Sequence, residues 1–212
     1  MVLAPWIFNA PFEQSVLTQI AIAMVACLSY NMLWGQGGML SFGHAVYTGL
    51  GAYMAMHVMQ GLGSGGWGVP VSLIPLVGGV CGMGFAVVLG YVSTRKSGTT
   101  LAMITLGLGE LVFAMSLMFS GFFGGEAGIS GNRVFGQPFL GITFGPPIQV
   151  YYLTAAYTFV CVALMYAFTR TPLGRILNAV RDNPERVEFI GYNTQQVRYV
   201  AFIIAGFFAG IA

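Results

Sequence analysis

The sequence has very few charged residues. Only 7% of its 212 residues are Asp, Glu, Lys or Arg, whereas 57% are hydrophobic. That charged fraction is roughly a third of the value for an average soluble domain, so too few polar side chains are available to cover a water-soluble fold. The composition therefore indicates an integral membrane protein.

Residues for catalysis or metal binding are also scarce. Cys27, Cys81 and Cys161 stand far apart in apolar runs without metal-ligand spacing, so we interpret them as packing residues. The net charge is only +2, and the basic residues are not clustered as nucleic-acid binding requires. No Ser/His/Asp constellation or carboxylate pair falls in one compartment. The sequence thus predicts no catalytic residue, no metal site, no cofactor and no nucleic-acid partner.

Two glycine-rich patterns resemble nucleotide-binding motifs but lack their context. Residues 61–66 match G-x-G-x-x-G, but no strand precedes them and they lie between two apolar runs. Residues 90–97 resemble a P-loop, but Arg95 stands in place of its second glycine. We therefore predict that this chain does not hydrolyse ATP itself.

Apolar runs long enough to cross a membrane dominate the sequence. A helix needs about 20 residues to cross roughly 30 Å of hydrocarbon. Five complete runs occupy residues 15–34, 40–59, 69–92, 99–123 and 148–169. A sixth begins near Tyr199 and is still apolar at Ala212, so we expect a truncated span in a C-terminally incomplete fragment. The predicted fold is all-α, a polytopic membrane protein with one transmembrane domain over residues 1–212.

The second of these runs is unusual. Residues 40–52 carry four polar side chains and three glycines. Irregular backbone is tolerated at membrane depth only where protein or a water-filled cavity satisfies it. The pattern leaves three alternatives open for residues 35–52, namely a plain crossing, a broken helix or a re-entrant segment.

The basic residues indicate an orientation in the membrane. Seven of the eight Lys and Arg residues fall on one side of the predicted spans, which the positive-inside rule assigns to the cytoplasm. Residues 93–98 and 170–198 are therefore expected in the cytoplasm and the N-terminus outside. The glycine-rich loop 124–147 is expected outside, with Arg133 as the single exception to the rule.

Residues 170–198 form the one extended polar segment, with five of the eight basic residues and three of the six acids. Thr171 before Pro172 and Asn183 before Pro184 are each typical of a helix N-cap followed by proline at the first helical position. We predict two short helices, broken at residues 182–183, with Gly191 as a left-handed stop. The second helix, of about seven residues, is too short to be stable alone and needs a docking surface. From the residues alone, a segment held by another protein and a loop held by lipid headgroups are equally compatible.

Polar residues inside the apolar runs are candidates for a translocation pathway. An ionised Glu110 in the middle of the fourth run costs at least a few kcal/mol unless it is paired or hydrated, so it should face protein or water. It either lines a pathway, braces two helices or is a hydrogen-bonded packing residue. His44 is either a pathway residue or a structural imidazole that bridges hydroxyls or carbonyls. The candidate pathway residues are Ser41, Gly43, His44 and Glu110.

Three motifs in the same order resemble the permease subunits of branched-chain amino-acid ABC importers, most closely the longer of the two paralogous permease types. The motifs are residues 37–45 with 49–53, residues 105–110 with 124–129, and the pattern Gly174-Arg175, Ala179, Arg181-Asp182-Asn183, Gly191. Val187 departs from the family pattern, in which small residues are common at this position, and Gly107 and Gly109 make the fourth run unusually rich in glycine.

The resemblance implies a permease that translocates branched-chain amino acids across the bacterial inner membrane, with ATP used by separate ATPase subunits. It also implies a paralogous permease subunit and an extracytoplasmic solute-binding protein as partners. The cytoplasmic loop 170–198 is then the ATPase-coupling segment. Its expected coupling residues are Gly174, Arg175, Ala179, Arg181, Asp182, Asn183, Pro184, Glu185, Arg186 and Gly191.

Other functions remain open at this point. Related permeases serve urea and short amides, and these residues do not determine the solute. A channel or secondary transporter, with Glu110 and His44 in coupling or gating, is the main alternative, and a membrane anchor without transport is a third.

Overall fold

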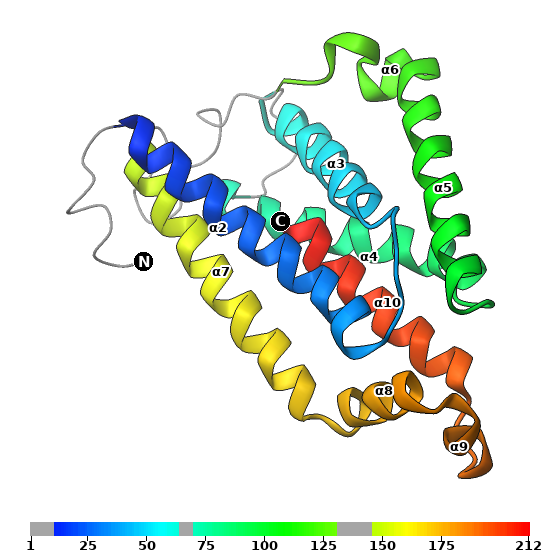
Figure 1. Ribbon diagram of the computed structural model, residues 1–212. Helices are drawn as coiled ribbons and strands as arrows, with labels where there is room; N and C mark the ends of the chain where they lie inside the picture. Colours follow the sequence, from blue (N-terminus) through cyan, green and yellow to red (C-terminus); the bar gives the residue numbers. More distant parts are fainter. Residues whose placement is uncertain (1–10, 64–69, 131–145) are drawn as a thin grey trace.

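The computed structural model describes residues 11–63, 70–130 and 146–212, and all regular elements in these ranges are helices. Figure 1 shows their arrangement. The first part of the chain forms α2 (Pro11–Asn31), the π-helix η1 (Met32–Gln36), α3 (Ala45–Gly63), the 3₁₀ helix η2 (Val71–Leu73), α4 (Ile74–Ser93) and α5 (Thr99–Met118). The second part forms α6 (Ser120–Phe123), the 3₁₀ helix η3 (Gly125–Ala127), α7 (Pro147–Arg170), α8 (Pro172–Asp182), α9 (Pro184–Phe189) and α10 (Thr194–Ile211).

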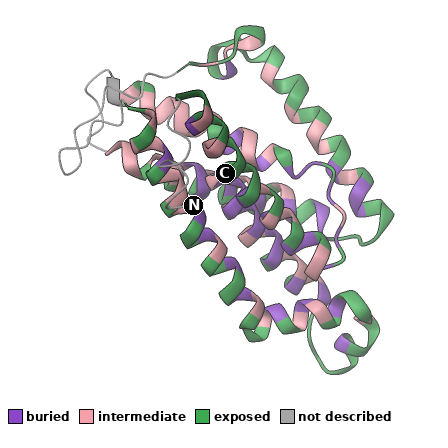
Figure 2. Ribbon diagram, turned by 60° about the vertical axis from the view of Figure 1, so that its left-hand side comes forward, coloured by how far each residue is buried: buried purple, intermediate pink, exposed green. Residues whose placement is uncertain are grey.

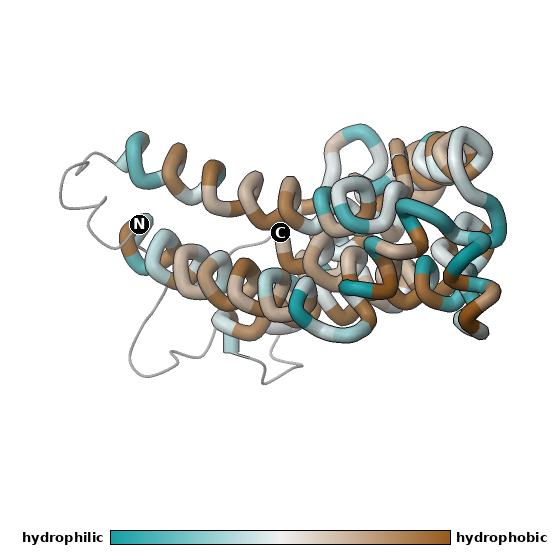
Figure 3. The backbone as a smooth tube through the Cα atoms, turned by 60° about the horizontal axis from the view of Figure 1, so that its bottom comes forward, coloured by the Kyte–Doolittle hydropathy of each residue, from teal (hydrophilic) through white to brown (hydrophobic). Residues whose placement is uncertain are grey.

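The predicted all-α polytopic membrane fold is confirmed. In the described part of the chain, four helices are long and apolar enough to cross a membrane. They are Pro11–Gln36, Val71–Ser93, Thr99–Met118 and Pro147–Arg170, which correspond to the first, third, fourth and fifth predicted spans. Helices α3 and α10 stand where the second and sixth spans were expected, and their crossing of the membrane stays a prediction. Figure 3 shows hydrophobic colours along the long helices and hydrophilic colours gathered in their connections.

Two predicted helical runs are interrupted. The second run does not begin at residue 40, because residues 37–44 are non-helical and α3 starts at Ala45. Gly38 has φ +62°, which ends the preceding helix and reverses the chain. Of the three alternatives for this region, the structure excludes a continuous helix, and both a broken helix and a re-entrant segment fit it. The fourth run ends at Met118 rather than residue 123, since Phe119 leaves helical geometry before the short α6 begins.

Helix α10 lies at the centre of the packing. It packs along α4 and also contacts α2, α3 and α8, while α2 pairs with α7. Ala201, Phe202, Ala205 and Ala209 of α10 are fully buried. By contrast, α5 contacts its own chain at few positions and exposes most of its surface, as Figure 2 shows.

Glycines allow α4 and α10 to come into backbone contact. A Cβ atom on Gly82 would lie 2.8 Å from the Gly206 carbonyl oxygen and 2.9 Å from Gly210 Cα. A Cβ on Gly78 would lie 2.6 Å from the Gly210 carbonyl oxygen. These four glycines therefore form the packing surface between α4 and α10. Small residues of this kind drive helix association in membranes because they permit close van der Waals contact.

Replacing Gly82 by valine should destabilise the fold because the new side chain overlaps the α10 backbone. We expect the unfolding free energy to fall by about 1–3 kcal/mol, as for other overpacked interiors, measured by thermal unfolding in mild detergent. The matched control is Gly84→Val in the same helix, where a Cβ meets nothing within 4 Å. Equal losses in the two variants would contradict the close α4–α10 contact.

Candidate functional site

The polar segment folds into the two predicted short helices. Thr171 Oγ1 accepts a hydrogen bond from Gly174 N at 3.2 Å, and Asn183 Oδ1 accepts one from Arg186 N at 3.1 Å. Each cap precedes a proline at the first helical position, so both predicted starts are confirmed. The break between the helices is Asn183 alone, because Asp182 still belongs to α8.

The turn between α7 and α8 explains the glycine at position 174. A Cβ there would overlap the Phe168 carbonyl oxygen and lie 3.1 Å from Thr169 Cα. The turn also holds Thr171, whose hydroxyl donates to the Phe168 carbonyl oxygen at 2.6 Å. Gly174 therefore sets the angle at which α8 leaves α7.

Helix α8 has one buried and one exposed side. Leu177 and Val180 are buried against the rest of the molecule. Arg175 and Ala179 are exposed on the other side, and Asp182 is exposed at the C-terminal end of α8. Figure 1 shows α8 and α9 at the end of the molecule where α7 finishes, away from the start of α2.

Arg181 is bound to its own chain. Its Nη1 atom donates to the Gly35 carbonyl oxygen at 2.5 Å, and its Nε atom donates to Asp182 Oδ1 at 3.0 Å. By contrast, Arg175 and Arg186 are exposed and their guanidinium groups form no ion pair with any residue that the structure describes. Of the three arginines among the predicted coupling residues, Arg175 and Arg186 are thus unpaired cations, whereas Arg181 holds the turn after η1.

Helix α9 packs on the rest of the molecule with one side and exposes the other. Val187, the departure from the family pattern, is buried, and Glu188 Oε1 accepts a hydrogen bond from Thr194 Oγ1 of α10 at 2.7 Å. Phe189 and Ile190 are 89% and 74% exposed. Sequence reasoning missed these two residues, although two large apolar side chains in the most polar segment were the available signal. Gly191 follows with φ +99°, as predicted for the left-handed stop.

Two predicted pathway residues are buried at the start of α3. His44 Nε2 lies 2.9 Å from Ser29 Oγ, and Ser29 donates its only hydroxyl proton to the Ala26 carbonyl oxygen. The proton in the Ser29–His44 bond must therefore come from Nε2. His44 Nδ1 and Ser41 Oγ are buried without a hydrogen-bond partner among the described residues.

A cavity of about 550 Å³ lies between α3, α5 and the residues around η3. Its lining is mainly apolar, with Phe42 and Gly43 at one end and Glu126 among the residues at the other. Of the four predicted pathway residues, only Gly43 lines this cavity. Ser41 and His44 lie beside Gly43 in the chain but outside the lining.

Glu110 lies apart from this cavity, on the exposed surface of α5. No hydrogen bond or ion pair joins it to another residue in the described ranges. Gly107 and Ala114, one turn away on either side, are also exposed, and a Cβ on Gly107 would meet nothing within 4 Å. The described residues contain no group of three or more His, Cys, Asp or Glu side chains that could hold a metal ion.

The chain is similar to known membrane permeases. The model of the branched-chain amino acid transport system / permease component family matches residues 14–212. The high-affinity branched-chain amino acid transport system permease protein LivM of Salmonella typhimurium is 28% identical over 219 residues, covering 93% of this chain and 50% of the relative. LivM of Escherichia coli is 26% identical, with the same coverage of both chains.

A third relative carries a different name. The fructose import permease protein FrcC of Rhizobium meliloti is 26% identical over 225 residues, covering 100% of this chain and 57% of the relative. The chain therefore spans about half the length of the curated relatives it matches. No solved structure matches it.

Removing the Asn183 cap should loosen α9. Asn183→Ala deletes the acceptor for Arg186 N, which costs about 1 kcal/mol at an N-cap. Because local opening exposes the backbone to proteases, we expect faster trypsin cleavage after Arg186. Asn183→Ser keeps an acceptor and serves as the control. Equal cleavage of the two variants would show that the cap does not stabilise α9.

Proposed function

This chain belongs to the family of branched-chain amino acid transport system permease components, and we propose on that basis that it is a permease subunit of an ATP-binding-cassette importer. It translocates branched-chain amino acids across the bacterial inner membrane, while separate subunits hydrolyse ATP. The names of the two LivM relatives support this solute class. The fructose permease FrcC shows that proteins of similar sequence import other small solutes, so urea and short amides stay as alternatives.

The single observation that carries the proposal is the projecting pair of capped helices α8 and α9. A six-residue helix forms here because Asn183 caps it and α10 holds it through Glu188 and Thr194. The pair presents two unpaired cations, Arg175 on α8 and Arg186 on α9, together with the exposed apolar side chain of Phe189 on α9. Arginines and aromatic side chains are both enriched in protein-docking surfaces. In an importer, the ATPase subunit is the partner that would bind such a surface.

The charge distribution supports the cytoplasmic location of this surface. Arg95 and Lys96 follow α4, Arg170 ends α7, and the cations of α8 and α9 come next in the chain. Positive residues of this kind remain on the cytoplasmic side during insertion. The opposite side would receive the solute-binding protein. The loop expected on that side, residues 124–147, lies largely outside the described residues.

The exposed surface of α5 supports a second membrane subunit. Glu110 is the twelfth of twenty residues in an otherwise apolar helix, so an exposed carboxylate there would face hydrocarbon in an isolated chain. An ionisable side chain in that position requires a partner or water. The small residues Gly107 and Ala114 on the same side permit close approach of another helix. We assign this surface to the paralogous permease, with Glu110 at the contact between the two subunits.

Reversing the two free cations should release the ATPase subunit. In the complete complex extracted with mild detergent, we expect Arg175→Glu combined with Arg186→Glu to abolish ATPase co-purification, since a matching acidic partner would then be repelled. Phe189→Ser should weaken the same contact without a charge change, because an exposed aromatic anchor is lost. Co-purification is measured by quantifying the ATPase subunit bound to the tagged permease.

The matched control is Arg95→Glu, which reverses an exposed cation outside residues 170–198. The Arg95 guanidinium carbon lies 4.7 Å from the centroid of the Tyr91 ring. Equal loss of the ATPase in the control would remove α8 and α9 as the docking surface. If the unaltered permease brings no ATPase, and uptake survives ATP depletion but collapses with the ion gradient, the channel or secondary-transporter alternative replaces the proposal.

Glu110 variants should distinguish a protein partner from lipid. Glu110→Gln keeps a hydrogen-bonding side chain of the same size, whereas Glu110→Leu leaves the partner's donor buried and unpaired. We expect Leu to lower recovery of the paralogous permease about tenfold, in line with the cost of an unsatisfied polar group, and Gln to lower it far less. If Leu leaves recovery unchanged or improves it, Glu110 faces lipid and this assignment is wrong.

A further inference from the structure

We propose that residues 35–44 transmit the movement of α8 to the cavity between α3 and α5. We call these residues the 35–44 segment. The inference rests on the proposed function, because it assigns a route to the coupling that an ABC importer needs. It depends on contacts that lie within this chain and do not involve the ATPase subunit.

The cytoplasmic end of the 35–44 segment is packed tightly on α8. Arg181 Nη1 binds the Gly35 carbonyl oxygen, and a Cβ on Gly38 would lie 2.7 Å from Arg181 Cγ. A Cβ on Gly37 would lie 3.3 Å from Leu177 Cδ1, and Leu177 is completely buried. The turn at Gly37 and Gly38 is therefore in direct contact with α8, so a movement of α8 toward the turn pushes on it.

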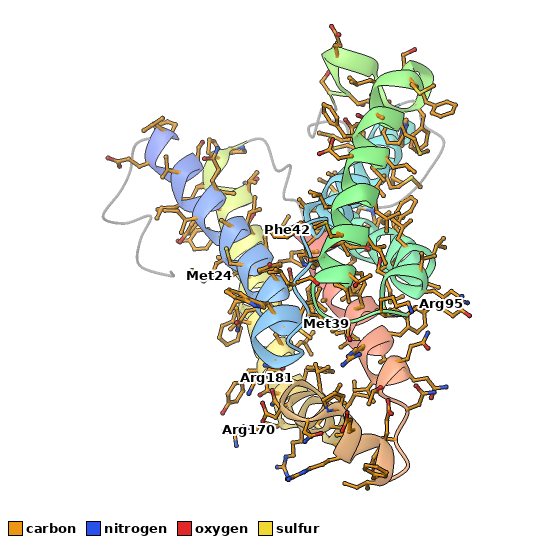
Figure 4. The ribbon with its side chains drawn as sticks, turned by 45° about the vertical axis from the view of Figure 1, so that its right-hand side comes forward. Met24, Met39, Phe42, Arg95, Arg170 and Arg181 are labelled. Atoms are coloured by element: carbon orange, nitrogen blue, oxygen red, sulfur yellow. The ribbon has the colours of Figure 1, made fainter. Side chains whose placement is uncertain are left out.

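The other end of the 35–44 segment is packed equally tightly on α5. Phe42 N donates to Thr105 Oγ1 at 3.2 Å, and a Cβ on Gly43 would overlap the Thr105 carbonyl oxygen. Phe42 and Gly43 also line the cavity of about 550 Å³. Figure 4 shows Phe42, Met39 and Arg181 one after another between α5 and α8. The same ten residues therefore contact the coupling helix at one end and form the cavity wall at the other.

The middle of the 35–44 segment is buried and is hydrogen-bonded to η1. Met39 N donates to the Leu33 carbonyl oxygen at 3.0 Å, and both Met39 and Ser41 are buried. Close-packed protein interiors have low compressibility and transmit displacement rather than absorb it. A movement of the turn at Gly38 must consequently reach Phe42 and Gly43.

Unsatisfied polar groups are concentrated in the 35–44 segment. Four buried side-chain atoms lack a hydrogen-bond partner among the described residues, and three of them are Gln36 Oε1, Ser41 Oγ and His44 Nδ1. Buried polar groups are nearly always hydrogen-bonded, so each of these atoms can gain a partner when the segment moves. Their concentration within nine residues suits an element that changes hydrogen-bond partners when α8 moves.

The decisive variant is Gly38→Ala in the complete transporter. The methyl group would push against Arg181 Cγ, so the contact between α8 and the turn is altered while the exposed surfaces of α8 and α9 are unchanged. We expect the ATPase subunits to remain bound and to hydrolyse ATP. The amount of solute transported per ATP should fall at least about fivefold, the lower end of typical coupling effects.

Gly98→Ala is the matched control. Gly98 has φ +68°, close to the +62° of Gly38, but a Cβ there meets nothing within 4 Å. Both variants thus place alanine at a positive φ, and only Gly38→Ala disturbs the contact with α8. If the two variants transport the same amount of solute per ATP, or if Gly38→Ala loses its ATPase subunits, the inference is overturned.

A second variant covers the case in which Gly38→Ala does not fold. Arg181→Ala removes the bond to Gly35 and leaves the glycine turn intact, and we expect it to lower solute transported per ATP in the same way. Where both single variants fold, the double variant should be no worse than the worse single variant, because both changes break one link. Additive losses would contradict a shared route. If the unaltered complex shows no ATP-dependent uptake, the proposed function itself fails, which is a separate outcome.

Discussion

In hydrocarbon, every backbone N–H and C=O group needs a partner within the protein, and this requirement decides where the chain can leave helical geometry. Residues 37–44 do so because the amides of Gly37, Gly38 and Met39 return to carbonyl groups of the preceding turn, and the amide of Phe42 reaches Thr105. The helix that follows this break is held by the glycine contact of α4 and α10, because a Cβ on Gly51 of α3 would lie 2.9 Å from both the Gly78 carbonyl oxygen and Gly210 Cα. Tight glycine packing therefore fixes α3 where the chain resumes helical geometry.

The polar end of the molecule, helices α8 and α9, is stabilised by different interactions. Helices α8 and α9 are too short to persist alone, so each is stabilised by a side-chain cap, a proline at its first position and packing on α7 or α10. Because the caps and the buried side chains stabilise these helices, the outward side chains form no contacts that the fold requires. Arg175, Arg186 and Phe189 are available to a partner for this reason, whereas Arg181 and Val187 maintain the internal contacts.

Features that a few neighbouring residues determine could be predicted from the sequence, whereas contacts between distant residues could not. The Thr171–Pro172 and Asn183–Pro184 starts and the Gly78–Gly82 packing surface were predictable because a few neighbouring residues determine each feature. The separate roles of Arg175 and Arg181 were not, since they depend on the Gly35 carbonyl oxygen 146 residues earlier in the chain. The sequence alone did not determine the break before Ala45, because polar residues in an apolar run indicate irregularity but not its form.

The central position of α10 has a consequence for biogenesis. During synthesis α2, α3, α4 and α7 all precede α10, yet α10 contacts α2, α3 and α4 and supplies much of the buried surface. Gly82 of α4 therefore meets Gly206 and Gly210 only after more than a hundred further residues have been translated, although α3 already contacts Gly78. The buried core around α10 can consequently assemble only late in synthesis.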